Sequence, residues 1–257
     1  LLTDGKLAGA VATLRTSGKV SNSGSRNVLA VLRGADPKVN HEAILLGAHM
    51  DHLGMRGGVL HPGADDNASG VAALLEIART FAAQPTRPRR TVIFAFWTGE
   101  EDGKFGSGHY VRHPRWPLAK TTAYLNLDMI GHPWTAEEIR KLVMEADSEK
   151  GGAFLANLAP GHFAEPGLAD WAPELAPILV RAGQCTGMAL HLDRTDGRSG
   201  GSDYRDFARA RVPFVRFFGN YFPEYHQPGD TATSLDSAQV QRMARLAFAT
   251  AWLLAEK

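Results

Sequence analysis

Short apolar segments alternate with amphipathic ones along this chain of 257 residues, and that alternation limits the folds it can adopt. Two of the apolar segments, AILLGA and TVIFAFW, are nearly all apolar, as strands buried on both faces of a sheet are. The predicted strands are 27–32, 43–48, 91–97, 124–130 and 213–218. The predicted helices, each with one apolar stripe, are 71–81, 175–182 and 240–252. Strands that alternate with helices predict an α/β domain with a mostly parallel, buried sheet.

Local signals set some of the boundaries. Asn67 or Ser69 is predicted to cap the first helix, and Ser237 the last. Thr135 and Glu138 fit a capping box, yet the residues that follow, 139–145, are compatible with either a helix or a strand. The chain starts without Met, which is compatible with a truncated or processed form. The predicted organisation is an irregular N-terminal segment over 1–26 and a single domain over 27–257.

Composition excludes several classes of protein. Hydrophobic residues make up 44% and charged residues 21%, the balance of a globular chain and not of a disordered one. There are 28 basic against 27 acidic residues, so no nucleic-acid partner is expected. The apolar stretches are too short to span a bilayer. The single cysteine, Cys185, excludes an intrachain disulfide and a cysteine-based zinc site.

Acidic and histidine residues follow the predicted strands at the point where each strand ends. These groups are His49-Met50-Asp51-His52, Glu100-Glu101, Asp128 and Tyr225-His226. A further acidic pair, Asp65-Asp66, lies just before the first predicted helix. In open α/β sheets, ligands bind outside the carboxyl ends of the strands. We therefore expect these side chains to converge on one edge of the sheet.

Histidine nitrogens and carboxylate oxygens are the ligands of a hydrolytic zinc site, and two such metals held close together need a bridging anion. A carboxylate in a tight turn before a helix, such as Asp66, suits that position. Asp51 lies two residues after His49, so its carboxylate is predicted to accept a hydrogen bond from the far ring nitrogen. Of the adjacent Glu100 and Glu101, one can bind a metal while the other stays free as a general base.

Six motifs resemble, in order, those of the co-catalytic zinc aminopeptidases. That family includes secreted bacterial leucine aminopeptidases, and its relatives include glutaminyl cyclase and glutamate carboxypeptidase. The motifs are GAHMDHLG (47–54), PGADDNASG (62–70), TGEEDG (98–103), NLDMIG (126–131), GSDY (201–204) and YHQPGDT (225–231). The resemblance runs from about residue 27 to the C-terminus. It implies the zinc-exopeptidase fold, an α/β three-layer sandwich in which a mostly parallel mixed sheet is flanked by helices.

The resemblance also implies two zinc ions per chain and a set of ligands for them. Asp66 matches the ligand that bridges both ions. His49 and Asp128 would complete one zinc site, and Glu101 and His226 would complete the other. In the family, the peptide bond that follows the bridging aspartate is cis.

Further residues match positions that assist the reaction. Glu100 matches the general base, Asp51 the partner of the histidine ligand, and Tyr225 a position that helps to stabilise the oxyanion in some members. Asp203 and Asp230 resemble supporting acids outside the ligand set.

The resemblance implies a metal-dependent aminopeptidase. Such an enzyme hydrolyses the N-terminal residue of a peptide with a free N-terminus through a zinc-bridging hydroxide, with Glu100 as the base. It also implies a periplasmic or secreted location. A glutaminyl cyclase-like single-zinc transferase and a carboxypeptidase of the same fold remain alternatives, and the oligomeric state is left open.

Two stretches depart from the family pattern. Residues 102–105 (DGKF) replace a Gly-Leu turn after the glutamate pair, and residues 221–224 (YFPE) stand where relatives carry a His and an Asp. A competing G-x-S-x-G reading around Ser199 would make the protein a serine hydrolase. That motif needs a buried strand directly before it, whereas residues 193–196 are polar and predicted to form a loop.

Overall fold

The computed structural model describes residues 24–146, 154–156, 158–159 and 161–257. In this part of the chain, seven strands form one sheet in the order β1-β5-β2-β6-β11-β8-β10. Their bounds are β1 (Val28–Leu32), β5 (Thr91–Trp97), β2 (Ala43–His49), β6 (Thr121–Asp128), β11 (Phe214–Phe218), β8 (Gly167–Ala169) and β10 (Asp193–Thr195). The five predicted strands are therefore confirmed, and they make up the first five positions of this sheet.

The sheet is mixed but mostly parallel. β5, β2, β6 and β11 run parallel to one another, and β10 runs parallel to β8. β1 is antiparallel to β5, and β8 is antiparallel to β11. The central strands β2 and β5 are buried along their whole length, which is why their sequences are apolar without alternation.

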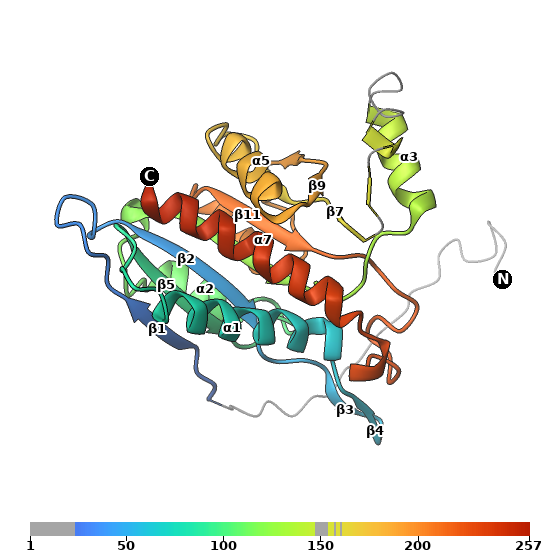
Figure 1. Cartoon of the computed structure of the whole chain (residues 1–257). Helices are drawn as coiled ribbons and strands as arrows, with labels where there is room; N and C mark the ends of the chain where they lie inside the picture. Colours follow the sequence, from blue (N-terminus) through green and yellow to red (C-terminus); the bar gives the residue numbers. More distant parts are fainter. Residues whose placement is uncertain (1–23, 147–153, 157, 160) are drawn as a thin grey trace, which may run out of the picture.

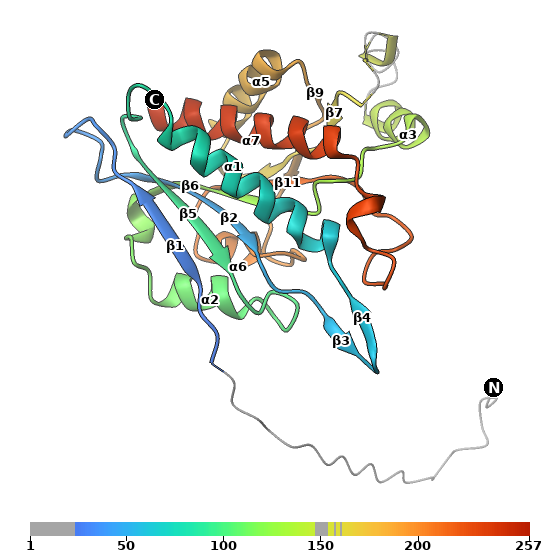
Figure 2. The same cartoon turned by 60° about the horizontal axis from the view of Figure 1, so that its bottom comes forward.

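Helices cover both faces of the sheet (Figures 1 and 2). α1 (Gly70–Ala82) and α7 (Ser237–Glu256) pack on β2 and β6 from one side, and α5 (Leu175–Thr186) packs on α7. On the other side α6 (Tyr204–Arg209) packs on β6 and β11, and α2 (Phe105–Arg112) packs on α6. The three-layer arrangement expected from the resemblance is therefore present.

Aromatic side chains fill the space between the layers. On the α6 face, the rings of Tyr124 and Phe207 stack with their centroids 3.9 Å apart. On the other face, Phe81 of α1 lies 4.9 Å from Phe248 of α7, between centroids. Burial of these rings fixes the helices against the sheet, and so fixes the strand ends from which the candidate site is built.

The structure settles or corrects several local predictions. Residues 139–145 belong to a helix, α3 (Ala136–Ala146), and the capping box forms because the Glu138 carboxylate accepts from the Thr135 N–H at 2.8 Å. The N-cap of α7 is Asp236, whose side chain accepts from two backbone N–H groups, so the prediction of Ser237 was wrong by one residue. Residues 193–195 form β10, where a loop was predicted, because they pair with β8.

Some short elements had no clear sequence signal. They are α2, α6, the β3–β4 hairpin (Gly54–Arg56 and Val59–His61), a small sheet of β7 (Phe163–Ala164) with β9 (Ala189–Leu190), and the turns η1 (Ala64–Ser69), η2 (Leu118–Lys120) and η3 (Ala232–Ser234). The prediction for residues 1–26 falls largely outside the described residues. Among the described helices, none has the length and apolar character to cross a membrane.

Candidate metal centre

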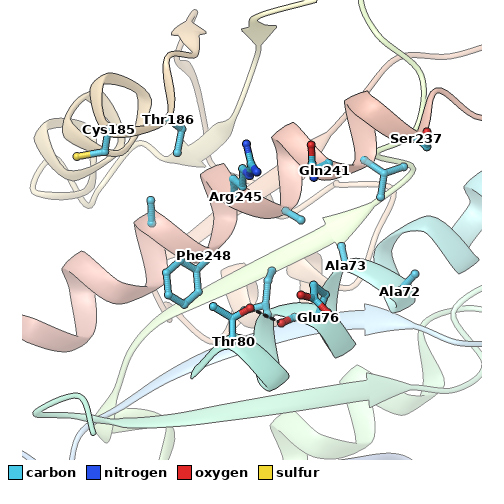
Figure 3. A pocket seen from close by; sticks show the side chains of 14 residues that line it. Ala72, Ala73, Glu76, Thr80, Cys185, Thr186, Ser237, Gln241, Arg245 and Phe248 are labelled. Atoms are coloured by element: carbon cyan, nitrogen blue, oxygen red, sulfur yellow. Dashed lines mark hydrogen bonds between the residues drawn. The ribbon is translucent and has the colours of Figure 1, made fainter. Parts of the chain in front are cut away.

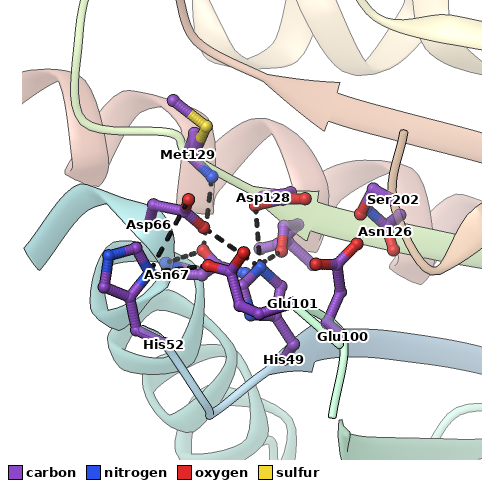
Figure 4. A network of polar contacts seen from close by, with 12 residues as sticks. His49, His52, Asp66, Asn67, Glu100, Glu101, Asn126, Asp128, Met129 and Ser202 are labelled. Carbon is purple, nitrogen blue, oxygen red and sulfur yellow. Dashed lines mark hydrogen bonds and ion pairs between the residues drawn. The ribbon is translucent and has the colours of Figure 1, made fainter. Parts of the chain in front are cut away.

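Four of the five predicted ligands, His49, Asp66, Glu101 and Asp128, meet at one edge of the sheet (Figure 4). His49 is the last residue of β2 and Asp128 the last of β6, while Glu101 follows β5 after a short turn. The turn η1 supplies Asp66, and the loop after β11 supplies His226. Because β2, β5, β6 and β11 are parallel, their carboxyl ends lie side by side, and the side chains that follow them are brought together.

Asp66 stands between two histidines and directs one carboxylate oxygen to each of them. Its Oδ1 lies 3.2 Å from His49 Nε2, and its Oδ2 lies 3.0 Å from His226 Nε2. The same His49 Nε2 lies 3.2 Å from Asp128 Oδ1. His226 Nε2 lies 3.3 Å from Glu101 Oε2. The five predicted ligands therefore form two groups that share Asp66.

His52 belongs to the cluster as well, although it had no predicted role. Its Nδ1 lies 2.7 Å from Glu101 Oε1, the oxygen that faces away from His226, and 3.7 Å from Asp66 Oδ2. Glu101 is thus held on both oxygens. The close contact with His52 lowers the pKa of Glu101 despite the opposing effect of burial. The signal for His52 was its place in the strand-end group 49–52, where three of four residues can bind a metal or hold a ligand.

Asp51 supports the centre, but by a different route from the one predicted. His49 Nδ1 bonds to the backbone carbonyl of Asp51 at 3.0 Å, while the nearer Asp51 carboxylate oxygen is 3.9 Å away. The carboxylate instead accepts from the backbone N–H groups of Glu100 at 3.1 Å and Glu101 at 3.3 Å. The predicted bond to His49 was wrong because the side chain turns toward these N–H groups, whose loop it anchors.

The turn that carries Asp66 is fixed by its neighbours. Asp230 accepts from the backbone N–H groups of Asp65 at 2.7 Å and Asp66 at 3.1 Å. The Asn67 amide donates to the carbonyl of Leu127, so the turn is tied to β6, and the Asp66–Asn67 peptide bond is cis, as the resemblance implied. Asn67, the first of the two cap candidates, accepts from the N–H of Gly70.

Glu100 lies beside the ligands without pairing to either histidine. Its side chain is 8% exposed, and its Oε1 lies 2.9 Å from Lys104 Nζ. Burial raises the pKa of Glu100 to about 7, against the opposing effects of His49 and Lys104. One oxygen of Glu100 lies within 4.8 Å of ligand atoms of His49 and Glu101. A carboxylate whose pKa lies near neutrality, next to a metal group, suits a general base.

The remaining predicted residues lie around the centre. The ring of Tyr225 packs on His226 with centroids 3.9 Å apart, and burial raises the pKa of Tyr225. Asp203 is 1% exposed, and burial raises its pKa to about 7. Ser199 of the competing serine motif is exposed, and His226, its required partner, is engaged with Asp66 and Glu101. The serine hydrolase reading therefore has no support from the geometry.

The donor set suits zinc, which binds histidine nitrogens and carboxylate oxygens. Four zinc bonds of about 2.0–2.1 Å place ligand atoms roughly 3.3 Å apart at the edges of a tetrahedron, and the histidine-to-carboxylate distances in each group here measure 3.0–3.3 Å. The carboxylates also need positive charge. Among the described residues, Lys104 is the only Lys or Arg with an ion pair to the acidic cluster Asp66, Glu100, Glu101 and Asp128, whose side chains are 5–13% exposed. Buried anions without cations are costly, so dications would stabilise this centre.

Comparison with known proteins agrees with this geometry. A family model described as Peptidase family M28 matches residues 27–251. Leucine aminopeptidase 2 of Trichophyton rubrum is 28% identical over 264 aligned positions, covering 90% of this chain and 47% of that protein. Leupeptin-inactivating enzyme 1 of Streptomyces exfoliatus is 36% identical over 132 residues, covering 50% of this chain and 28% of that protein. The chain thus spans less than half the length of these curated relatives.

The fold is also that of solved structures. A zinc aminopeptidase from Bacillus subtilis superposes with a TM-score of 0.66 at 23% identity, covering 90% of this chain and 50% of that one. The family model reaches from β1 into α7 and so includes every strand end that contributes to the centre. The six motifs, the shared aspartate and the matched model lead to one conclusion: the chain belongs to peptidase family M28.

Proposed function

We propose that this chain is the catalytic domain, over residues 27–257, of a zinc aminopeptidase that uses two metal ions. The single observation that carries the proposal is the division of the Asp66 carboxylate between His49 and His226, at 3.2 and 3.0 Å. A buried carboxylate with one oxygen for each of two separate ligand groups is what a pair of dications requires. The names of the relatives, a leucine aminopeptidase among them, support the same reaction.

His49, Asp66 and Asp128 would hold one ion, and Asp66, Glu101 and His226 the other. Bound zinc supplies a Lewis acid for the scissile carbonyl and lowers the pKa of water. The chain has a suitable residue at all five ligand positions that the family resemblance implies, which favours a two-zinc aminopeptidase over a single-zinc transferase. No described feature favours a carboxypeptidase.

The chain's own residues would carry out the proton transfers. Glu100 takes a proton from the attacking water and delivers it to the leaving amine, so that water and peptide give a carboxylic acid product and a free amine. Asp51 fixes Glu100 and Glu101 through their backbone N–H groups. Tyr225 packs against His226, and its hydroxyl is assigned here to the developing oxyanion.

Peptides with a free N-terminus are the proposed substrates. The ammonium group would be held by the carboxylates of the centre, which outnumber the nearby cations, and removal would proceed one residue at a time. The location remains a proposal, periplasmic or secreted.

Hydrolysis of leucine p-nitroanilide by the zinc-loaded protein tests this function, with N-acetyl-leucine p-nitroanilide as the matched control. We expect cleavage of the first substrate alone, loss of activity on chelation and recovery on adding zinc. One zinc per chain together with cyclised product from an N-terminal glutamine peptide would instead support a cyclase. Cleavage from the C-terminus would support a carboxypeptidase.

A further inference from the structure

The two adjacent glutamates of the centre contact the side chains of two different basic residues. Glu101 contacts His52 at 2.7 Å, and Glu100 contacts Lys104 at 2.9 Å. The first contact stabilises a proposed metal ligand. The second involves a residue from the stretch where this chain departs from the family pattern, residues 102–105.

Lys104 reaches Glu100 through both its backbone and its side chain. Its N–H donates to the Glu100 carbonyl at 2.9 Å, and the N–H of Gly103 donates to the same oxygen at 2.9 Å. Its Nζ lies 2.9 Å from Glu100 Oε1. Backbone hydrogen bonds and a side-chain ion pair therefore both join Lys104 to Glu100, and together they restrict the orientation of the Glu100 side chain.

The other end of Lys104 is anchored in the fold. Lys104 is the N-cap residue of α2, and its carbonyl accepts from the N–H of Gly108 at 3.0 Å and from the Ser107 hydroxyl at 3.3 Å. The Lys104 side chain is 12% exposed, so its ammonium group has few water molecules as alternative partners. A cation fixed in this way can hold a carboxylate in one orientation.

The backbone of Lys104 adopts a conformation that a side chain disfavours. Its φ of 66° and ψ of 39° lie in the left-handed region, which glycine enters without the clash that a Cβ causes. A lysine here costs conformational energy that a glycine would not, but it places a cation beside Glu100. Strained residues of this kind concentrate at functional sites.

From these contacts we infer that Lys104 is the positioning residue of the base: its ammonium group holds one oxygen of Glu100 so that the other faces the metal centre. This inference rests on the proposed function, in which Glu100 moves the proton. Lys104 does not touch the substrate or the metals in this scheme, and it acts through Glu100 alone.

The test compares Lys104→Met, Glu100→Gln and the double variant, with Lys120→Met as a matched control at an exposed lysine. For leucine p-nitroanilide we expect Lys104→Met to lower kcat about 10- to 100-fold, because a small misplacement of a catalytic group has that effect. KM and the zinc content should stay at the wild-type level. In the Glu100→Gln background the methionine substitution should have no further effect, and Lys120→Met should match wild type.

The zinc content and its resistance to a chelator give a readout that does not depend on turnover. Lys104→Met should retain zinc as well as wild type does, since the five ligands are untouched. The inference would be overturned if Lys104→Met lost zinc, or if it raised KM with kcat unchanged. It would also be overturned if Lys104→Met lowered kcat as much in the Glu100→Gln background as in wild type. If Lys104→Met fails to fold, Lys104→Gln serves instead, and wild-type kcat in that variant would also overturn it.

Failure of the inference and failure of the proposed function give different results. A zinc-loaded wild-type protein that leaves the anilide intact would refute both. An active wild type with a fully active Lys104→Met variant would refute the role of Lys104 alone.

Discussion

Replacing Asp66 with asparagine should remove the stabilisation that zinc gives to the fold without destabilising the metal-free protein. In the absence of metal, burial raises the pKa of Asp66 against the opposing effect of the contact with His49, and the nearby Asp128 and Glu101 add to the rise. The neutral amide of asparagine has the same shape and avoids this repulsion. The metal-free variant should therefore melt at or slightly above the temperature of the metal-free wild type.

The magnitude of the zinc effect follows from linkage. A site at a metal concentration of 100 times Kd contributes about 2.7 kcal/mol, so two sites contribute about 5 kcal/mol. For a domain of this size that corresponds to a rise in Tm of roughly 10–20 °C. If asparagine weakens both sites about 100-fold, the same zinc concentration equals the new Kd, and each site contributes only about 0.4 kcal/mol.

Thermal unfolding with and without zinc measures this difference directly. Asp65→Asn is the matched control, because Asp65 is its fully buried neighbour and bonds to His132 and the Gly131 N–H instead of to the proposed ligands. That control should lose stability in both states yet keep its zinc-dependent rise in Tm. An Asp66→Asn variant that keeps the wild-type zinc-dependent rise, at the same half-saturating zinc concentration, would refute the shared-ligand reasoning.

Three further substitutions separate the other roles. Glu100→Gln should keep both metals and lose about 10²- to 10⁴-fold in kcat, since it cannot accept a proton; unchanged hydrolysis of leucine p-nitroanilide would exclude it as the base. His52→Ala should weaken zinc binding about 10- to 100-fold by freeing one oxygen of Glu101, and chelator competition that shows wild-type affinity would contradict this. Asp230→Ala leaves two buried backbone N–H groups without their acceptor, so it should lower the free energy of unfolding by about 2–5 kcal/mol; an unchanged urea midpoint would count against that support.

The sheet and the convergence of the candidate ligands could be predicted because both depend on strong local patterns. AILLGA and TVIFAFW are short and almost wholly apolar, as strands of a buried sheet are, and parallel strands bring their carboxyl ends together. His49, Asp128 and the pair Glu100-Glu101 follow directly from those ends. The resemblance was needed to choose Glu101 over Glu100 and to assign His226 to a zinc, because loops carry these residues into place and no periodicity predicts where a loop returns.

The side-chain contacts that were predicted wrongly or missed involve groups with several possible partners nearby. The spacing of His49 and Asp51 allowed a carboxylate bond, but two backbone N–H groups in the loop that follows the neighbouring strand β5 compete for that carboxylate. Lys104 was visible only as a departure from a pattern, since its pairing with Glu100 depends on a left-handed turn. Residues 193–195 are polar and still form a strand, because pairing with β8 outweighs their composition.

Diffraction from zinc-soaked crystals, with anomalous signal collected at the zinc edge, tests the central claim most directly. We predict two anomalous peaks about 3.5–4 Å apart, one next to His49 and Asp128, the other next to Glu101 and His226, with the Asp66 carboxylate between them. A single peak, or two peaks with Asp66 turned away from one of them, would contradict the account.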